Sequence, residues 1–232
     1  MGAKEFPMQY HFDFTWLATY WPVFVEGAWM TVRLIFVGGV LGITLGIYCA
    51  WARALGPKIL GYPVAVYVEL IRNTPFLIQL FFIFFGLPSL GLRMDEVEAA
   101  MLAMVINLGA YSAEIIRAGI QATPKGQFEA GSSLAMTPVQ TFRHIVLVPA
   151  LQKIWPALAS QVVIVMLGSA VVSQIAVEDL TYAANFTQSR TFRAFEAYFV
   201  STLIYLALAI LLRFALMWLG TLIFATKRRA AR

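Results

Sequence analysis

Long, nearly uncharged apolar runs are the feature that most restricts how this chain of 232 residues can fold. The hydrocarbon core of a bilayer is about 30 Å thick, so a helix needs about 20 apolar residues to cross it. The chain is 60% hydrophobic and 12% charged, and a water-soluble domain of that composition would expose large apolar patches. The runs therefore predict an all-α polytopic membrane protein with five spans, at residues 29–51, 63–88, 99–121, 154–176 and 197–224.

The charges between these spans alternate in sign. Residues 52–62, 117–153 and the end of the chain are mainly basic, whereas the segments before span one, between spans two and three, and between spans four and five are mainly acidic. The positive-inside rule then predicts an outer N-terminus and a cytoplasmic C-terminus, as five spans require. Because topology accounts for the net charge of +5, nucleic acid is not an expected partner. The predicted parts are an outer or interfacial segment at 1–28, a transmembrane domain at 29–225 with a cytoplasmic loop at about 122–150, and a basic cytoplasmic tail at 226–232.

Small residues recur every fourth position in the first span, as Gly38, Gly42 and Gly46. This spacing places them on one helix face and lets a neighbouring backbone approach closely. The pattern predicts helix packing rather than ligand binding.

Charged residues also occur inside spans two and three. Glu69 and Arg72 are three residues apart, as are Glu114 and Arg117, so each pair shares a helix face, and both pairs lie near the cytoplasmic ends of their spans. Pro75 is expected to kink span two. Charges in a membrane indicate either a solute pathway or an ion pair that holds the bundle, and both interpretations remain open. Polar residues of the fourth span add to the possible route or gate, whose candidate residues are Glu69, Arg72, Gln79, Glu114, Arg117, Gln161, Ser169 and Ser173.

The sequence contains none of the usual catalytic patterns. It has no G-x-x-x-x-G-K-[ST] loop for phosphates and no H-E-x-x-H pair for a metal. Its single cysteine, Cys49, lies within the first span, and its serines have no plausible base nearby in the sequence. No metal, cofactor or catalytic residue is predicted in this chain, so the energy for any transport must come from elsewhere.

The segment from Gln127 to Pro149 interrupts the spans with mixed helix-forming and helix-breaking signals. Residues 129–136 can form about two helical turns, Thr137-Pro138 breaks them, and residues 140–146 can start a second helix that Pro149 is expected to end. The prediction is a short helical elbow that projects from the membrane surface.

This segment resembles the EAA loop of the inner-membrane subunits of ATP-driven, binding-protein-dependent importers. Two departures are an alanine at 135, where the family usually has glycine, and Leu147-Val148-Pro149-Ala150, where the proline of the family's LPxA pattern comes one place late. The resemblance implies that the loop docks on ATPase subunits, through Glu129, Ala130, Gly131, Leu134, Ala135, Met136, Gln140, Phe142, Ile145 and Pro149.

Two further stretches are similar to the polar-amino-acid permeases of that family. One runs from Glu69 to Ile83 with Phe-Gly-Leu-Pro at 85–88, and the other from Gly109 to Gln121 with Pro-Lys-Gly-Gln at 124–127. Asn73 departs from this pattern, because many relatives have Gly or Ser there, and it is a position where substrate fit could change. In all, the resemblance covers roughly residues 27–225.

The resemblance implies the type I ABC importer permease fold and a non-catalytic translocation subunit for polar amino acids or close derivatives. The implied partners are two cytoplasmic ATPase subunits that bind ATP-Mg, a second permease subunit that is identical or homologous, a periplasmic solute-binding protein and the lipid bilayer of a bacterial inner membrane. The alternative is a secondary amino-acid transporter in which Glu69 and Glu114 carry protons. A membrane-bound enzyme is a more distant possibility. The sequence does not identify the amino acid or the composition of the permease pair.

Overall fold

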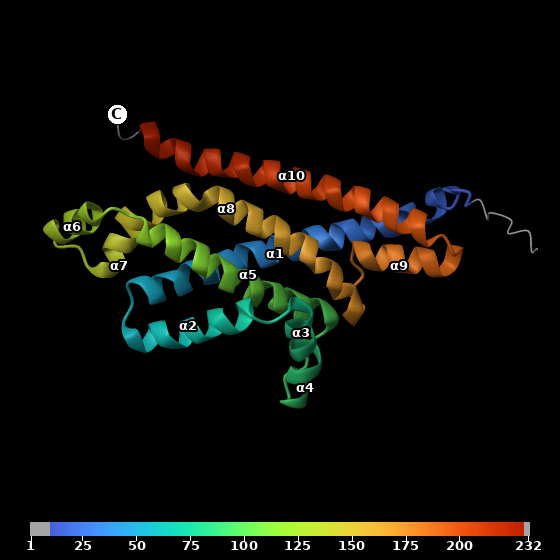
Figure 1. Cartoon of the computed structure of the whole chain (residues 1–232), viewed down its shortest axis with the longest axis horizontal. Coiled ribbons are helices and arrows are strands. Elements are labelled where there is room, and N and C mark those ends of the chain that lie inside the picture. Colours follow the sequence, from blue (N-terminus) through green and yellow to red (C-terminus); the bar gives the residue numbers. More distant parts are fainter. Residues whose placement is uncertain (1–9, 230–232) are drawn as a thin grey trace, which may run out of the picture.

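The computed structural model describes residues 10–229, and all regular elements in this part of the chain are helices. The four longest are α1 (Leu17–Ala54), α5 (Glu96–Gln121), α8 (Leu147–Gly168) and α10 (Ala194–Arg229), which run side by side along the long axis (Figure 1). The shorter helices are α2 (Lys58–Arg72), α3 (Phe76–Phe81), α4 (Leu87–Ser89), α6 (Lys125–Ser133), α7 (Pro138–Thr141) and α9 (Leu180–Thr191). π-helical turns at Phe82–Gly86 and Phe142–Val146 join α3 to α4 and α7 to α8, and a 3-10 helix at Ser169–Ile175 extends α8.

The predicted all-α membrane architecture is confirmed, with different span boundaries. Four segments are long and apolar enough to cross a membrane, namely Leu17–Ala54, Glu96–Gln121, Pro138–Ile175 and Ala194–Phe224. The described residues contain a fifth span if the bent pair made of α2 with Phe76–Ser89 is counted as one. The first helix begins at Leu17 instead of residue 29, and it continues through Pro22 and the exposed Glu26.

The glycine face of α1 packs against α5, as predicted. A β-carbon at Gly42 would lie 3.0 Å from Cβ of Leu108, and one at Gly46 would lie 3.0 Å from the backbone nitrogen of Ala113. Without an aqueous driving force, such close contact is what holds membrane helices together. The α1–α5 pair is therefore the centre of the bundle, and its main buried cluster includes Leu34, Leu80, Met104, Leu108 and Met166.

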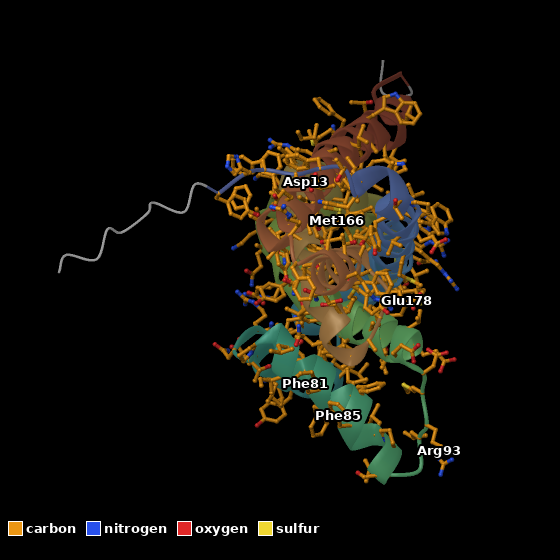
Figure 2. The ribbon with its side chains drawn as sticks, turned by 90° about the vertical axis from the view of Figure 1, so that its right-hand side faces the viewer. Asp13, Phe81, Phe85, Arg93, Met166 and Glu178 are labelled. Atoms are coloured by element: carbon orange, nitrogen blue, oxygen red, sulfur yellow. The ribbon has the colours of Figure 1, made fainter. Side chains whose placement is uncertain are left out.

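The second predicted span is not one kinked helix, because it breaks completely between Arg72 and Phe76. The two parts meet at an angle of 113°. Pro75 has no backbone N–H and disfavours the helical conformation of Thr74, so the helical hydrogen bonds cannot continue across this point. As a result, α3 and α4 project sideways from the bundle as an arm. Figure 2 shows Phe85 and Arg93 on this side of the molecule, away from Met166 in the bundle.

Pro149 does not end a helix, so this expectation was wrong. The helical segment continues from Pro138 to Ile175, and the fourth span begins well before the predicted residue 154. The turn at Phe142–Val146 is π-helical, and the N–H of Leu147 donates to the carbonyl of Phe142. A proline clashes with the carbonyl four residues earlier in a regular α-helix, and the extra residue in a π-turn shifts that register. This accounts for a proline that the helix tolerates.

The opposite end of the bundle carries α9, a helix that was not predicted from the sequence. Asp179 starts this helix, where its Oδ1 accepts a hydrogen bond from the N–H of Tyr182 at 2.9 Å. Its Oδ2 accepts one from the Tyr205 hydroxyl at 2.9 Å, and the N–H of Leu180 donates to Oγ1 of Thr31 at 3.3 Å. The side chain of Asp179 is fully buried, and burial raises its pKa to about 6. These bonds join α9 to α1 and α10.

Candidate functional site

The loop between α5 and α8 folds into a helical hairpin, α6–α7 (residues 125–141), at the end of the bundle opposite α9 (Figure 1). At the end of α6, the N–H of Met136 donates to the carbonyl of Gly131 at 3.1 Å, and the N–H of Ala135 donates to that of Ser132 at 3.0 Å. This is a Schellman turn, whose left-handed position usually carries glycine. Here Ala135 occupies that position with a φ of 52°. The alanine seen as a departure in the sequence thus lies where the backbone favours glycine.

A capping box starts the second arm of the hairpin. The Oγ1 atom of Thr137 accepts from the N–H of Gln140 at 3.3 Å, and Oε1 of Gln140 accepts from the N–H of Thr137 at 2.8 Å. These bonds satisfy two backbone donors that a helix start leaves without partners. The predicted break at Thr137-Pro138 is confirmed. The side chain of Gln140 is bonded to the backbone of Thr137 within the hairpin.

Gly131 sets the distance between the two arms. A β-carbon at this position would lie 2.6 Å from Cγ2 of Thr141, so a larger residue cannot fit without moving the arms apart. The tip of the hairpin presents apolar side chains, because Leu134 is 71% exposed and Val139 is 54% exposed. Of the predicted docking residues, the exposed ones are Glu129, Ala130, Leu134, Ala135, Gln140 and Pro149, the half-buried ones are Met136 and Ile145, and the buried ones are Gly131 and Phe142.

Gln79 stabilises the break between α2 and α3. Pro75 cannot donate to the carbonyl of Ile71, and Nε2 of Gln79 donates to that carbonyl at 2.7 Å. The same nitrogen lies 3.0 Å from both the carbonyl and the hydroxyl of Thr74, and the Thr74 hydroxyl donates to the carbonyl of Leu70 at 2.8 Å. Two side chains therefore satisfy backbone carbonyls that the break exposes, which is the condition for irregular backbone within a membrane.

The break borders a cavity of about 430 Å³ between α3, α5 and α8, whose mainly apolar lining carries a few polar side chains. Asn107 lies on this wall, and its Nδ2 donates to Oε1 of Gln79 at 3.0 Å. The lining contains no carboxylate and no basic side chain, and it comprises Thr74, Pro75, Phe76, Asn107, Tyr111, Gln161, Ile164, Val165 and Gly168. The uncharged polar groups at this wall can bind a polar solute in an otherwise apolar bundle.

Of the two predicted charge pairs, only Glu114–Arg117 forms. Arg117 binds Glu114 with its guanidinium, and Nη1 of Arg53 on α1 lies 2.7 Å from Oε2 of the same carboxylate. In the part of the chain that the structure describes, Glu69 and Arg72 make no ion pair with each other. Both are exposed, and the guanidinium carbon of Arg72 lies 5.8 Å from the centre of the Tyr111 ring. In place of two separate pairs, the structure shows a triad of Arg53, Glu114 and Arg117.

The polar residues of the fourth span divide into two groups. Gln161 lines the cavity. Ser169 is buried and donates to the carbonyl of Met166 at 2.6 Å, and Ser173 donates to that of Ala170 at 3.0 Å, so both serines bond to their own helix. Asn73 also lies outside the cavity lining, and its Nδ2 donates to the carbonyl of Glu69 at 2.8 Å.

Sequence reasoning missed Asn107, Tyr111 and Arg53 as members of these sites. Asn107 is a lone amide in an apolar helix, a signal that could have been weighed beside Gln79. Arg53 lies in the basic segment 52–62 that indicates topology, and its contact with Glu114 joins residues 61 positions apart. Such a contact cannot be read from helix spacing.

The comparisons with known proteins agree with this architecture. The family described as "Binding-protein-dependent transport system inner membrane component" matches residues 42–227. The chain belongs to this family. It is 34% identical to the glutamine transport system permease protein GlnP of Escherichia coli (strain K12), over 90% of this chain and 95% of that protein. It is also 35% identical to the L-cystine transport system permease protein TcyB of Bacillus subtilis (strain 168), over 70% of this chain and 69% of that protein.

Among solved structures, a chain of an amino acid ABC transporter with histidines has the same fold, with a TM-score of 0.80 and 36% identity, covering 91% of this chain and 99% of that chain. The sequence-based assignment to the amino-acid ABC permeases is thereby confirmed. The chain is a multi-pass membrane permease of an ABC importer, and it is not an enzyme.

Proposed function

We propose that the chain is the translocation subunit of an ATP-driven importer for polar amino acids or close derivatives. The observation that carries this proposal is the set of polar side chains that line the cavity at the break in span two. Asn107, Tyr111 and Gln161 offer amide and hydroxyl groups there, among apolar lining residues such as Ile164 and Val165. Polar groups within a membrane are costly and mark solute pathways. The relatives named for glutamine and cystine support amino acids as the substrate class.

The hairpin α6–α7 is proposed to couple the cavity to ATP hydrolysis. Its tip exposes Leu134 and Val139 on a turn held by backbone hydrogen bonds, which suits insertion into a groove of an ATPase subunit. The helices on either side of the hairpin are α5 and α8, and both line the cavity. A displacement of the hairpin would therefore move two cavity walls. ATP-driven closure of two such subunits, which hold ATP-Mg, would switch the route by rigid-body rocking.

The remaining partners follow from the same proposal. A second permease subunit, identical or homologous, completes the route in a bacterial inner membrane, and a periplasmic solute-binding protein delivers the amino acid. The Arg53–Glu114–Arg117 triad joins α1 to α5 near the hairpin end, and we assign it a structural role. Glu69 and Arg72 are exposed near the break and are assigned to the mouth of the route.

The proposed orientation places the hairpin in the cytoplasm and α9 outside. Its support is the basic character of the hairpin end, where Arg53, Arg117 and Lys125 lie. In a Cys49→Ala background, Arg93→Cys and Glu178→Cys should react with an impermeant thiol reagent in intact cells, whereas Gly126→Cys should not. All three positions are exposed, so accessibility across the membrane decides the result. Labelling of Gly126→Cys from outside would reverse the orientation.

The function is tested by reconstitution with the ATPase subunits and binding protein that copurify with the chain. Uptake of a radiolabelled amino acid into proteoliposomes should require ATP on the hairpin side. Uptake by this chain alone, driven by an imposed proton gradient, would instead establish the secondary transporter that the membrane carboxylates also allow.

A further inference from the structure

The hydrogen bonds around Gln79 fix the orientation of two side-chain amides. Three acceptors, the carbonyls of Ile71 and Thr74 and the Thr74 hydroxyl, surround its nitrogen at 2.7–3.0 Å. A carboxamide nitrogen only donates and its oxygen only accepts, so Oε1 of Gln79 must point the other way, toward Asn107. Asn107 meets this oxygen with its own nitrogen at 3.0 Å. The break in span two thus determines that Asn107 bonds to Gln79 through its nitrogen and not through its oxygen.

The oxygen of Asn107 is the atom that remains. The side chain of Asn107 is 8% exposed and lines the cavity. Among the described residues, none donates a hydrogen bond to its Oδ1. This oxygen is not completely enclosed by protein, so it remains accessible to a small molecule. A nearly buried acceptor without a protein donor is an unusual feature, because buried polar atoms are almost always paired. Its accessible side is the cavity.

Both sides of the break are joined to the same turn of α5. The Tyr67 hydroxyl on α2 donates to the carbonyl of Ile106 at 2.6 Å, and Gln79 on α3 accepts from Asn107. The position of Asn107 is therefore fixed from both helices, so its oxygen is preorganised rather than free to rotate.

We propose that Asn107 is a specificity-determining residue whose Oδ1 accepts a hydrogen bond from the ammonium group of the transported amino acid, and that Gln79 is the positioning residue that turns this oxygen toward the cavity. This rests on the proposed function and assigns a substrate group to its cavity. An ammonium group fits because it carries three donors and no acceptor, and no charged side chain is part of the lining, the described cation beside it being Arg72, whose guanidinium carbon lies 5.8 Å from the centre of the Tyr111 ring.

The test compares each amino acid with an analogue that differs only in lacking its α-ammonium group, or both of these groups for cystine. The purified complex with its ATPase subunits is assayed by equilibrium binding with L-glutamine against glutaramate, L-histidine against imidazolepropionate, and L-cystine against dithiodipropionate. The wild type should prefer the amino acid, and Asn107→Leu should reduce that preference about tenfold or more, because a hydrogen bond to a charged group is of this size. Gln79→Leu should reduce it as well, although Gln79 does not touch the substrate.

Two variants control for misfolding. Asn107→Asp loses the donor to Oε1 of Gln79, but both of its oxygens accept, so an acceptor faces the cavity whichever way the carboxyl turns, and the variant should keep the preference for the amino acid in a less stable complex. Asn73→Leu removes an exposed amide from the same break, outside the cavity lining, and should change nothing. Equal loss of affinity for the amino acid and its analogue in Asn107→Leu, or a lost preference in Asn107→Asp, would overturn the assignment while leaving the proposed function intact. A wild-type complex that binds none of the three amino acids would count against the proposed function itself.

Discussion

The hairpin α6–α7 and the break in span two are both interruptions of helical structure, but they are held in different ways. In the hairpin, the turn is made by bonds between residues at most five positions apart, such as Met136 to Gly131 and Thr137 to Gln140. At the break, the decisive bond joins Gln79 to Asn107, 28 positions away. The hairpin is therefore a local unit that can move as one body, whereas the break depends on the packing of α3 against α5.

The largest expected effect is that of enlarging Gly131. Gly131→Val places a side chain against Thr141, where even a β-carbon would be 2.6 Å away, so the arms of the hairpin should separate. We expect loss of most of the copurifying ATPase with little change in amino-acid binding at the cavity. Gly126→Ala in the same helix is the matched control, because a β-carbon there meets nothing within 4 Å. An intact complex with Gly131→Val would show that the packing of the two arms is not needed for docking.

A pH effect is expected at the α9 end, which lies outside both interruptions. Burial raises the pKa of Asp179 from 3.8 to about 6, so the folded protein binds this proton more tightly than the unfolded chain. The stabilisation is fully present below about pH 4 and is lost as the pH rises through 6, a difference of about 3 kcal/mol.

Thermal unfolding of wild type and Asp179→Asn from pH 4 to 8 measures this effect. The variant should lack this part of the pH dependence, and ATPase association should be equal in both. An identical pH dependence in the two proteins would refute the assignment to Asp179.

A smaller effect is expected on local stability, and it can be measured separately at the break and at the hairpin by replacing one threonine in each. Thr74→Val removes a hydroxyl that bonds to Leu70 and Gln79 at the break, and Thr137→Ala removes the helix cap of the hairpin. Each should cost about 1 kcal/mol of local stability. Hydrogen exchange should accelerate around residues 71–79 in the first variant and around 137–141 in the second. Acceleration at both regions in either variant would mean that they are not independent.

The smallest effect should be a gain. Ala135→Gly removes the unfavourable left-handed conformation of an alanine with a φ of 52°. It should raise the free energy of local opening of the hairpin by about 0.5–1 kcal/mol, which is measured as slower hydrogen exchange. Ala130→Gly, within regular helix α6, should destabilise by a similar amount. If Ala135→Gly also accelerated exchange, the left-handed turn would not be a source of strain.

The same contrast explains what the sequence could predict. The hairpin was predictable because Thr137-Pro138 and the residues around it carry local helix signals, and the glycine face of α1 followed from spacing alone. The complete break at Pro75 was expected only as a kink, because its stability depends on Gln79 replacing the missing donor. The Arg53–Glu114 contact and the role of Asn107 depend on how α1, α3 and α5 pack. Pro149 was misread because a preceding π-turn has no signal in a residue list.

The most direct test of this account measures ATPase retention and amino-acid binding in the same purified complex, for Gly131→Val and for Asn107→Leu. Gly131→Val should lose the ATPase subunits and keep the preference for an amino acid over its analogue without the ammonium group, and Asn107→Leu should show the reverse. Joint loss of both properties in both variants would contradict the assignment of coupling to the hairpin and of recognition to the cavity.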